Sequence, residues 1–206
     1  MKLKYFIDSH KAMTALAVLS LIVFYNQWDN PTAWVYLALH GSYGFLWLLK
    51  SRIFPDRQWE QACNLIIGGG IWGVLSLYWI APWLITSQNR QAPGWYLACC
   101  ISMYTFGVFF HFTADLQKYI ALKLRPGQLV TEGLWRKVRN PNYFGELLIY
   151  LGFSLLARDW IPIAALAFVI CIVWIPNIIR KDRSLSRYPE YASYKAKSKW
   201  LIPFIF

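Results

Sequence analysis

The sequence predicts an all-α polytopic membrane protein with about six transmembrane helices. Hydrophobic residues make up 57% of the 206 residues, and the mean hydropathy is positive. This composition is too apolar for an ordinary soluble domain. Long uncharged runs separate the charged residues, and about 20 apolar residues suffice to cross a hydrocarbon core. The runs cover residues 12–28, 30–49, 61–89, 91–114, 147–157 and 160–179.

The expected elements follow from these runs in order. Proline removes a backbone donor and restricts the residue before it, so Pro31, Pro55 and Pro93 mark breaks. Helices are expected over about 10–27, 32–50, 61–87 and 95–124. The run 147–157 is short, so the fifth helix must extend upstream to Asn142. The sixth covers 160–179, and a basic tail rich in tyrosine follows it. We expect one membrane domain over 1–206, with 1–110 as a helical scaffold and 111–206 as the half that carries the function.

The distribution of Lys and Arg predicts the orientation. Six helices place all of these cations on one side except Arg90 and Arg158. Because positively charged loops stay in the cytoplasm during insertion, both termini are expected to be cytoplasmic. A five-helix alternative that fuses 143–179 would put the basic C-terminal cluster outside, against the same rule.

Composition also bears on partners. The net charge of +11 lies mostly near predicted helix ends, so we expect membrane lipids as partners and no nucleic acid. The four cysteines fall in apolar helices and lack metal-ligand spacing, so no metal site is expected. They are Cys63, Cys99, Cys100 and Cys171.

Ionisable residues within or beside the apolar runs are the candidate functional groups. His111, Asp115 and Lys118 are spaced to share one face of the fourth helix. Glu146 follows Asn142 by four residues, so these two also share a face. Such groups must pair with each other or line a wet cavity. The simplest alternatives are a structural Asp115–Lys118 pair and a tail that only binds lipid.

A sequence motif resembles a known family. The segment 139–146 reads Arg-Asn-Pro-Asn-Tyr-Phe-Gly-Glu, and Gly-Leu-Trp precedes it at 133–135. It resembles the R-H-P-N-Y-x-G-E signature of the membrane steroid 5-alpha-reductase and sterol reductase superfamily. The ending, with Glu190-Tyr191, Tyr194-Lys195 and the segment Leu201-Ile202-Pro203-Phe204, is also similar to that superfamily. The resemblance covers about 111–206.

The resemblance implies a cofactor and the residues that bind it. The same superfamily contains isoprenylcysteine carboxyl methyltransferases and phospholipid methyltransferases, which bind S-adenosylmethionine. Asn142 together with Glu146 favours the reductase branch, which uses NADPH. Asp115 and Lys118 lie in a segment that resembles a bacterial reductase-like subgroup, which implies a bacterial inner membrane with the cofactor on the cytoplasmic side. The full set implied to surround the cofactor is Asp115, Lys118, Lys123, Arg125, Trp135, Arg139, Asn142, Tyr143, Glu146, Arg180, Asp182, Tyr191 and Tyr194.

The chain departs from the family in the part that acts on the substrate. The N-terminal glutamate motif of steroid 5-alpha-reductases is absent, and Trp47 stands where their tyrosine is expected. Tyr43 lies one helical turn before Trp47 and is a candidate replacement acid, with His40 nearby. Glu146 is a second catalytic candidate. Asn140 replaces the usual histidine and is expected to cap the fifth helix.

These features are compatible with three functions. The first is an NADPH-dependent oxidoreductase that reduces a C=C bond of a steroid-, sterol- or isoprenoid-like substrate drawn from the bilayer. The second is a membrane methyltransferase that uses S-adenosylmethionine. The third is a non-catalytic membrane subunit.

Overall fold

A computed structural model describes residues 1–203 and 205, and over these residues the chain is helical without a named strand. Phe204, part of the family-like ending, lies outside the described residues. The elements are α1 (Leu3–Phe24), α2 (Pro31–Ile53), η1 (Arg57–Glu60), α3 (Leu65–Ser76), η2 (Leu77–Trp79), α4 (Ile80–Ser87), α5 (Gly94–Leu124), η3 (Gly133–Arg136), α6 (Pro141–Leu156), α7 (Trp160–Val169), η4 (Ile170–Trp174, a π-helix), α8 (Ile175–Leu185) and α9 (Tyr191–Lys197).

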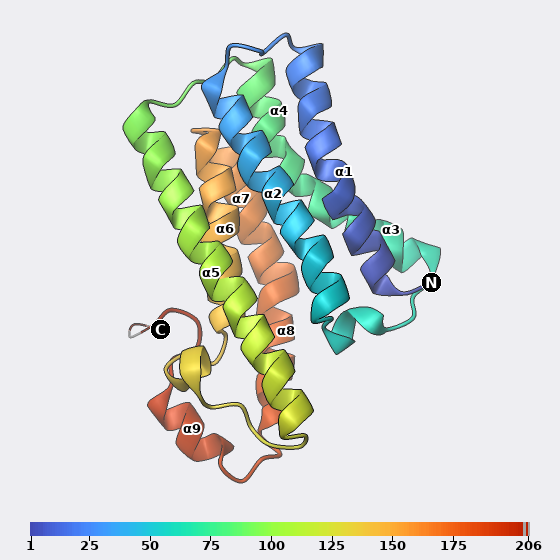
Figure 1. The fold of residues 1–206 in the computed structure, drawn as a ribbon, viewed down its shortest axis with the longest axis vertical. Coiled ribbons are helices and arrows are strands. Elements are labelled where there is room, and N and C mark those ends of the chain that lie inside the picture. Colours follow the sequence, from blue (N-terminus) through green and yellow to red (C-terminus); the bar gives the residue numbers. More distant parts are fainter. Residues whose placement is uncertain (204, 206) are drawn as a thin grey trace.

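Several short elements join into longer rods (Figure 1). The elements α3, η2 and α4 are continuous, as are α7, η4 and α8. Four helical segments are long and apolar enough to cross a membrane: Leu3–Phe24, Leu65–Ser87, Gly94–Leu124 and Trp160–Leu185. The helices α2 and α6 fall outside that set. The count of six spans and the orientation therefore stay predictions.

The helix bounds differ from the expected ones where packing overrides composition. The first helix begins at Leu3 and not near residue 10, because its charged first turns pack against η1. The last helix runs past Arg180 to Leu185. Two lysines assigned to the membrane surface, Lys11 and Lys50, are instead buried at 2% and 4% exposure.

Proline explains one irregular stretch. Pro82 in α4 has no N–H, so the Tyr78 carbonyl four residues earlier loses its usual helical donor. The Tyr36 hydroxyl donates to that oxygen at 2.8 Å. A side chain of α2 therefore supplies the hydrogen bond that the backbone lacks in the continuous segment of α3, η2 and α4. At this point the helix narrows into the 3₁₀ turn η2.

The connections gather at two ends of the bundle. The turns 25–30, 88–93 and 157–159 meet at one end, the upper end in Figure 1. Asn30 donates to the Arg90 carbonyl at 3.2 Å, and the Arg90 side chain donates to the Ala157 carbonyl at 3.0 Å. Arg90 also pairs with Asp159 at 2.7 Å. Arg90 and Arg158, predicted for the sparsely charged side, therefore do lie at one end of the bundle.

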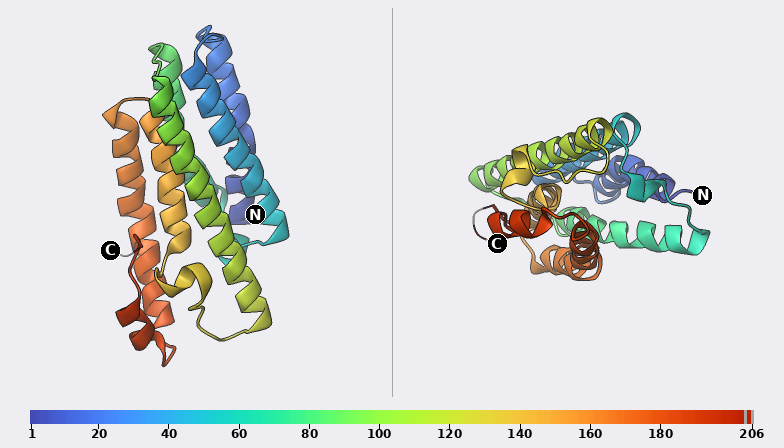
Figure 2. Two further views of the ribbon diagram at one scale, coloured as in Figure 1. Left: turned by 60° about the vertical axis from the view of Figure 1, so that its left-hand side comes forward. Right: turned by 90° about the horizontal axis from the view of Figure 1, so that it is seen from below.

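The closest helix pair is α5 with α6, which run antiparallel (Figure 2). A Cβ added to Gly107 would lie 2.8 Å from the Gly145 carbonyl oxygen and from Ile149 Cγ1. A Cβ added to Gly145 would collide with the His111 backbone nitrogen. Small residues allow this approach of two backbones, as is usual between membrane helices. The contact fixes α6 against the polar face of α5.

We expect Gly145→Ala to lower the free energy of unfolding by about 1–3 kcal/mol, because the added methyl group overpacks two backbones. Thermal unfolding in detergent measures this effect. Gly73→Ala in α3 is the control, since nothing lies within 4 Å of its added Cβ. Equal melting temperatures for the two variants would contradict the packing argument.

Candidate functional site

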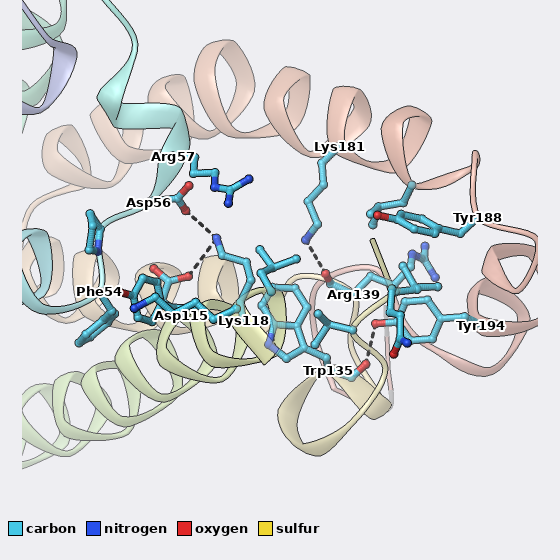
Figure 3. Close-up of a pocket in the computed structure, with 18 of the residues that line it drawn as sticks. Phe54, Asp56, Arg57, Asp115, Lys118, Trp135, Arg139, Lys181, Tyr188 and Tyr194 are labelled. Carbon is cyan, nitrogen blue, oxygen red and sulfur yellow. Dashed lines mark hydrogen bonds and ion pairs between the residues drawn. The ribbon is translucent and has the colours of Figure 1, made fainter. Parts of the chain in front are cut away.

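Two adjoining cavities lie between the helices. The first, of about 510 Å³, is enclosed by the end of α2, η1, α5, η3 and the α8–α9 region (Figure 3). The second, of about 420 Å³, lies among α1, α3, α6 and the η4–α8 region. Both volumes fall in the range of roughly 300–1,000 Å³ typical of small-molecule sites. Lys50, Asp56 and Asp115 line both cavities, so this polar group marks their junction.

Ion pairs hold the junction together. Lys50 Nζ lies 2.6 Å from Asp115 Oδ2, and both side chains are 4% exposed. Lys118 Nζ lies 2.6 Å from Asp56 Oδ2 and 3.6 Å from Asp115 Oδ1; Figure 3 shows it between the two carboxylates. The predicted face of α5 is therefore real, but its closest partners come from the end of α2 and the loop after it. Sequence spacing gave no signal for these distant partners.

The first cavity has a basic wall. Lys118, Arg139, Lys181 and Arg187 line it, together with Arg57 and Lys123. Among the described residues, the side chains of Arg57 and Lys123 form no ion pair or hydrogen bond, although Lys123 Nζ lies 4.6 Å from the centroid of the Tyr119 ring. These two cations are therefore available to an anionic ligand.

The family-like motif forms a rigid corner beneath this wall. Trp135 donates to the Ala114 carbonyl at 3.1 Å, and the Tyr194 hydroxyl donates to the Trp135 carbonyl at 2.6 Å. Arg139 donates to the Ser198 carbonyl at 2.7 Å. The motif before α6 and the tail after α8 thus form one unit (Figure 2).

Asn140 differs from its expected role. It does occupy the N-cap position of α6, with Pro141 at the first helical position. Its side chain, however, makes no capping hydrogen bond. It donates to the Trp200 carbonyl at 2.8 Å and accepts from Lys181 Nζ at 2.7 Å. The Asn140 amide therefore bonds to the C-terminal tail instead of to the start of its own helix. The local sequence gave no indication of this distant partner.

The second cavity combines an apolar wall with one polar face of α6. Asn142, Glu146 and Tyr150 follow each other at intervals of four residues and all line it. The Glu146 carboxylate has no hydrogen bond or ion pair to any other described residue, and the buried Asn142 Oδ1 also lacks a partner. Polar groups in such a place are expected to find a hydrogen-bond partner, here in a ligand or water. Aliphatic residues of α3 and η4, such as Ile71 and Val173, form the opposite wall.

Sequence reasoning missed Lys11. This α1 residue lines the second cavity, and its Nζ donates to the Tyr150 hydroxyl at 2.9 Å. It forms no ion pair with the described carboxylates. The only sequence signal was a cation eight residues inside a helix that begins at Leu3.

The predicted cofactor residues divide into three groups. The first cavity is lined by Asp115, Lys118, Lys123, Trp135, Arg139 and Tyr194. The second is lined by Asn142, Tyr143 and Glu146, with Asp115 at the junction. Neither wall includes Arg125, Arg180, Asp182 or Tyr191.

The residues of the third group have other partners. Arg125 pairs with Glu132, and this hydrogen bond holds the pKa of the Glu132 carboxyl below its usual value. Arg180 is exposed, with Nη1 3.5 Å from Asn177 Oδ1. Asp182 Oδ2 lies 3.6 Å from Arg139 Nε, so this ion pair helps to hold the motif residue Arg139 in place. Tyr191 is buried in the tail.

Tyr43, the proposed acid, is buried behind the second cavity. Its hydroxyl oxygen lies 3.5 Å from that of Tyr150, and neither cavity wall includes it. His40, its predicted companion, instead contacts the Tyr36 hydroxyl at 2.9 Å and stacks on Phe153. Within the described residues, no group of three or more His, Cys, Asp or Glu is placed to hold a metal ion.

Fold and site together define a helical protein with membrane-length spans and two adjoining cavities, one with a basic wall and one with an aliphatic wall. The model of the family described as "Protein of unknown function (DUF1295)" matches residues 56–198. The chain belongs to this family and is similar to steroid 5-alpha-reductases.

Named relatives support this relationship at low identity. The steroid 5-alpha-reductase DET2 of Solanum lycopersicum is 25% identical over 204 residues, which covers 91% of this chain and 76% of the relative. The protein of the same name from Gossypium hirsutum is 22% identical over 65% of this chain and 52% of its own length. An uncharacterized protein of Schizosaccharomyces pombe is 26% identical over 52% of this chain and 37% of its own length.

We expect Lys50→Met to destabilise the fold by about 3–5 kcal/mol, because it leaves Asp115 buried without its nearest partner. Adding Asp115→Asn to that variant should restore part of the loss, since the uncompensated charge disappears. Thermal unfolding in detergent measures both effects. Lys2→Met is the control: Lys2 pairs with Glu60 at the surface, where solvent screens the pair, so its removal should cost far less stability. Similar losses at Lys2 and Lys50 would contradict this account.

Proposed function

We propose that this protein is a membrane reductase that uses NADPH to reduce a C=C bond in a lipophilic, steroid-like substrate. The observation that carries the proposal is the junction, at Lys50, Asp56 and Asp115, of a cavity that has a basic wall with a cavity that has an aliphatic wall. A phosphorylated dinucleotide needs cations for its phosphates, and a hydride acceptor from the bilayer needs an apolar chamber. The two requirements meet at one place.

The residues present fit the cofactor. Arg57 and Lys123 are unpaired cations on the first cavity, suited to phosphate oxygens. Asn142 and Glu146 offer unpartnered polar groups in the second cavity, suited to a carboxamide or ribose hydroxyl. When bound, the dinucleotide would supply the hydride, while the protein binds and orients both reactants.

The second cavity suits a lipophilic substrate. Its aliphatic wall belongs to α3 and to the π-helical segment η4, and π-helical turns often occur at functional sites. Ile66 and Ile67 of α3 are exposed, as expected for residues that face lipid. We propose that the substrate reaches the cavity from the bilayer between these two segments.

The relatives named steroid 5-alpha-reductase support the proposal of a reductase. A methyltransferase is the competing proposal, but a methyl donor such as S-adenosylmethionine carries no phosphate and leaves the basic wall without a counter-charge. We also propose that the basic cavity faces the cytoplasm, in keeping with the cation distribution, and that the host membrane is a bacterial inner membrane.

Arg57→Ala and Lys123→Ala should each weaken NADPH binding about tenfold, the effect expected for loss of one charge-assisted contact. Titration of the purified protein with NADPH, followed by nucleotide fluorescence, measures the affinities. Arg125→Ala is the matched control, because it removes an equal charge outside both cavities. If S-adenosylmethionine binds saturably and NADPH does not, the reductase proposal is overturned in favour of the methyltransferase.

Turnover provides a second test. The protein in detergent should oxidise NADPH when a steroid enone is added, and mass spectrometry should show a product heavier by two hydrogens. Glu146→Gln should slow this reaction, since it alters the unpartnered carboxyl group in the second cavity. Binding of NADPH without oxidation by any steroid, sterol or isoprenoid enone would favour a non-catalytic subunit.

A further inference from the structure

A buried lysine and a tyrosine form an unassigned polar pair in the second cavity. Lys11 is 2% exposed and Tyr150 is 3% exposed, and their side chains are joined at 2.9 Å. Aromatic rings surround the ammonium group: the centroid of Tyr43 lies at 4.5 Å, that of Tyr150 at 5.1 Å and that of Trp47 at 5.6 Å.

Burial of this cation is costly and needs a reason. A lysine this deep is normally paired with a carboxylate, yet Lys11 forms no ion pair within the described part of the chain, and the Glu146 carboxylate in the same cavity acts on it only from a longer distance. The ring faces and one hydroxyl compensate it only in part. A residue that served packing alone would cost less as a leucine or methionine. The charge is therefore better explained by what it does to Tyr150.

The packing holds Lys11 in place. Gly44 of α2 touches the Lys11 backbone so closely that an added Cβ would collide with the Lys11 carbonyl oxygen. On the other side, Tyr78 stacks on Tyr150 with ring centroids 4.2 Å apart. Both partners of the pair are thus fixed, and both line the second cavity.

We propose that Tyr150 is the proton donor that binds the carbonyl oxygen of an α,β-unsaturated ketone, and that Lys11 is the positioning residue that supports it. This inference rests on the proposed reductase function and assigns the group that replaces the missing family acid. It differs from the expectation for Tyr43, which lies behind Tyr150 and away from the cavity walls.

The chemistry balances with these two residues. Reduction of an enone requires one hydride, which the bound dinucleotide supplies, and one proton. A C–H bond forms at the carbon β to the carbonyl, and the displaced π electrons move to the carbonyl oxygen. The Tyr150 O–H bond breaks and its proton goes to that oxygen, which gives an enol. Lys11 returns a proton to the Tyr150 oxygen and regains one from water, and the enol tautomerises to the saturated ketone.

A ligand pair that differs only in the carbonyl tests this without turnover. Testosterone is an enone, and its deoxy analogue lacks only the ring carbonyl. Trp47 and Trp174 line the second cavity, so protein fluorescence can report binding. The wild type should bind testosterone about tenfold more tightly than the deoxy analogue, as one buried hydrogen bond implies.

Variants then assign that preference to a residue. Tyr150→Phe should abolish the preference and slow reduction at least tenfold, with NADPH affinity unchanged. Tyr104→Phe is the matched control: Tyr104 is buried, bonded to Ser42 and away from both cavities, so it should keep the preference. Lys11→Met should lower kcat and the preference together, and Lys11→Arg should restore part of both, because a guanidinium can still donate to Tyr150. Thermal unfolding confirms that each variant is folded.

The outcomes separate this inference from the proposed function. A Tyr150→Phe protein that keeps its full carbonyl preference, or a loss seen only with Tyr43→Phe, overturns the inference alone. The inference alone is also overturned if the wild type binds NADPH but binds testosterone and its deoxy analogue with equal affinity. If the wild type binds neither NADPH nor either steroid, the proposed function falls together with it.

Discussion

The buried ion pair between Lys50 and Asp115 is the interaction on which the site depends. It joins α2 to α5 at the junction of the two cavities, with both side chains almost fully removed from solvent. Charges at that depth are tolerated only when they are compensated, so each residue requires the other. The second pair, Lys118 with Asp56, ties the loop after α2 to the same face of α5. One polar cluster therefore forms part of the wall of both cavities.

The surrounding scaffold serves to bring distant backbones close enough for this cluster to form. The close glycine contact brings α6 against α5, where His111 Nδ1 lies 3.2 Å from the Asn142 carbonyl oxygen. Asn142 and Glu146 of α6 therefore line the same cavity as Asp115 of α5. The tail then locks the start of α6 through Arg139 and Asn140. Several residues that the family motif marks, Arg139 among them, therefore contribute much of their effect by holding the corner in place. The groups that face open space, such as Glu146 and Arg57, are the ones left to contact ligands.

The two cavities differ in the kind of ligand they suit. The first offers unpaired cations at the end of the bundle, and the second offers an aliphatic wall together with polar side chains from several helices. A ligand with an anionic part and a neutral, reactive part would span the junction. The hydrogen-bonded side chains of Lys11 and Tyr150 also line the second cavity and add a polar pair to its wall.

The sequence by itself determined the helical class, the family and six of the residues that line the first cavity, and four of its six predicted spans are long and apolar enough to cross a membrane. These features follow from local composition, from helical spacing and from a contiguous motif. It placed Asn142 and Glu146 on one face correctly, because four residues make about one helical turn.

Only the tertiary structure decided which charges meet. Lys50, Asp56 and Lys11 approach their partners across 60 to 140 positions of chain, and the choice of a partner depends on which helices pack together. Asn140 illustrates the same limit of local reasoning. Its neighbours in the sequence predicted a capping hydrogen bond, but its side chain bonds to the Trp200 carbonyl, which only folding brings close to it.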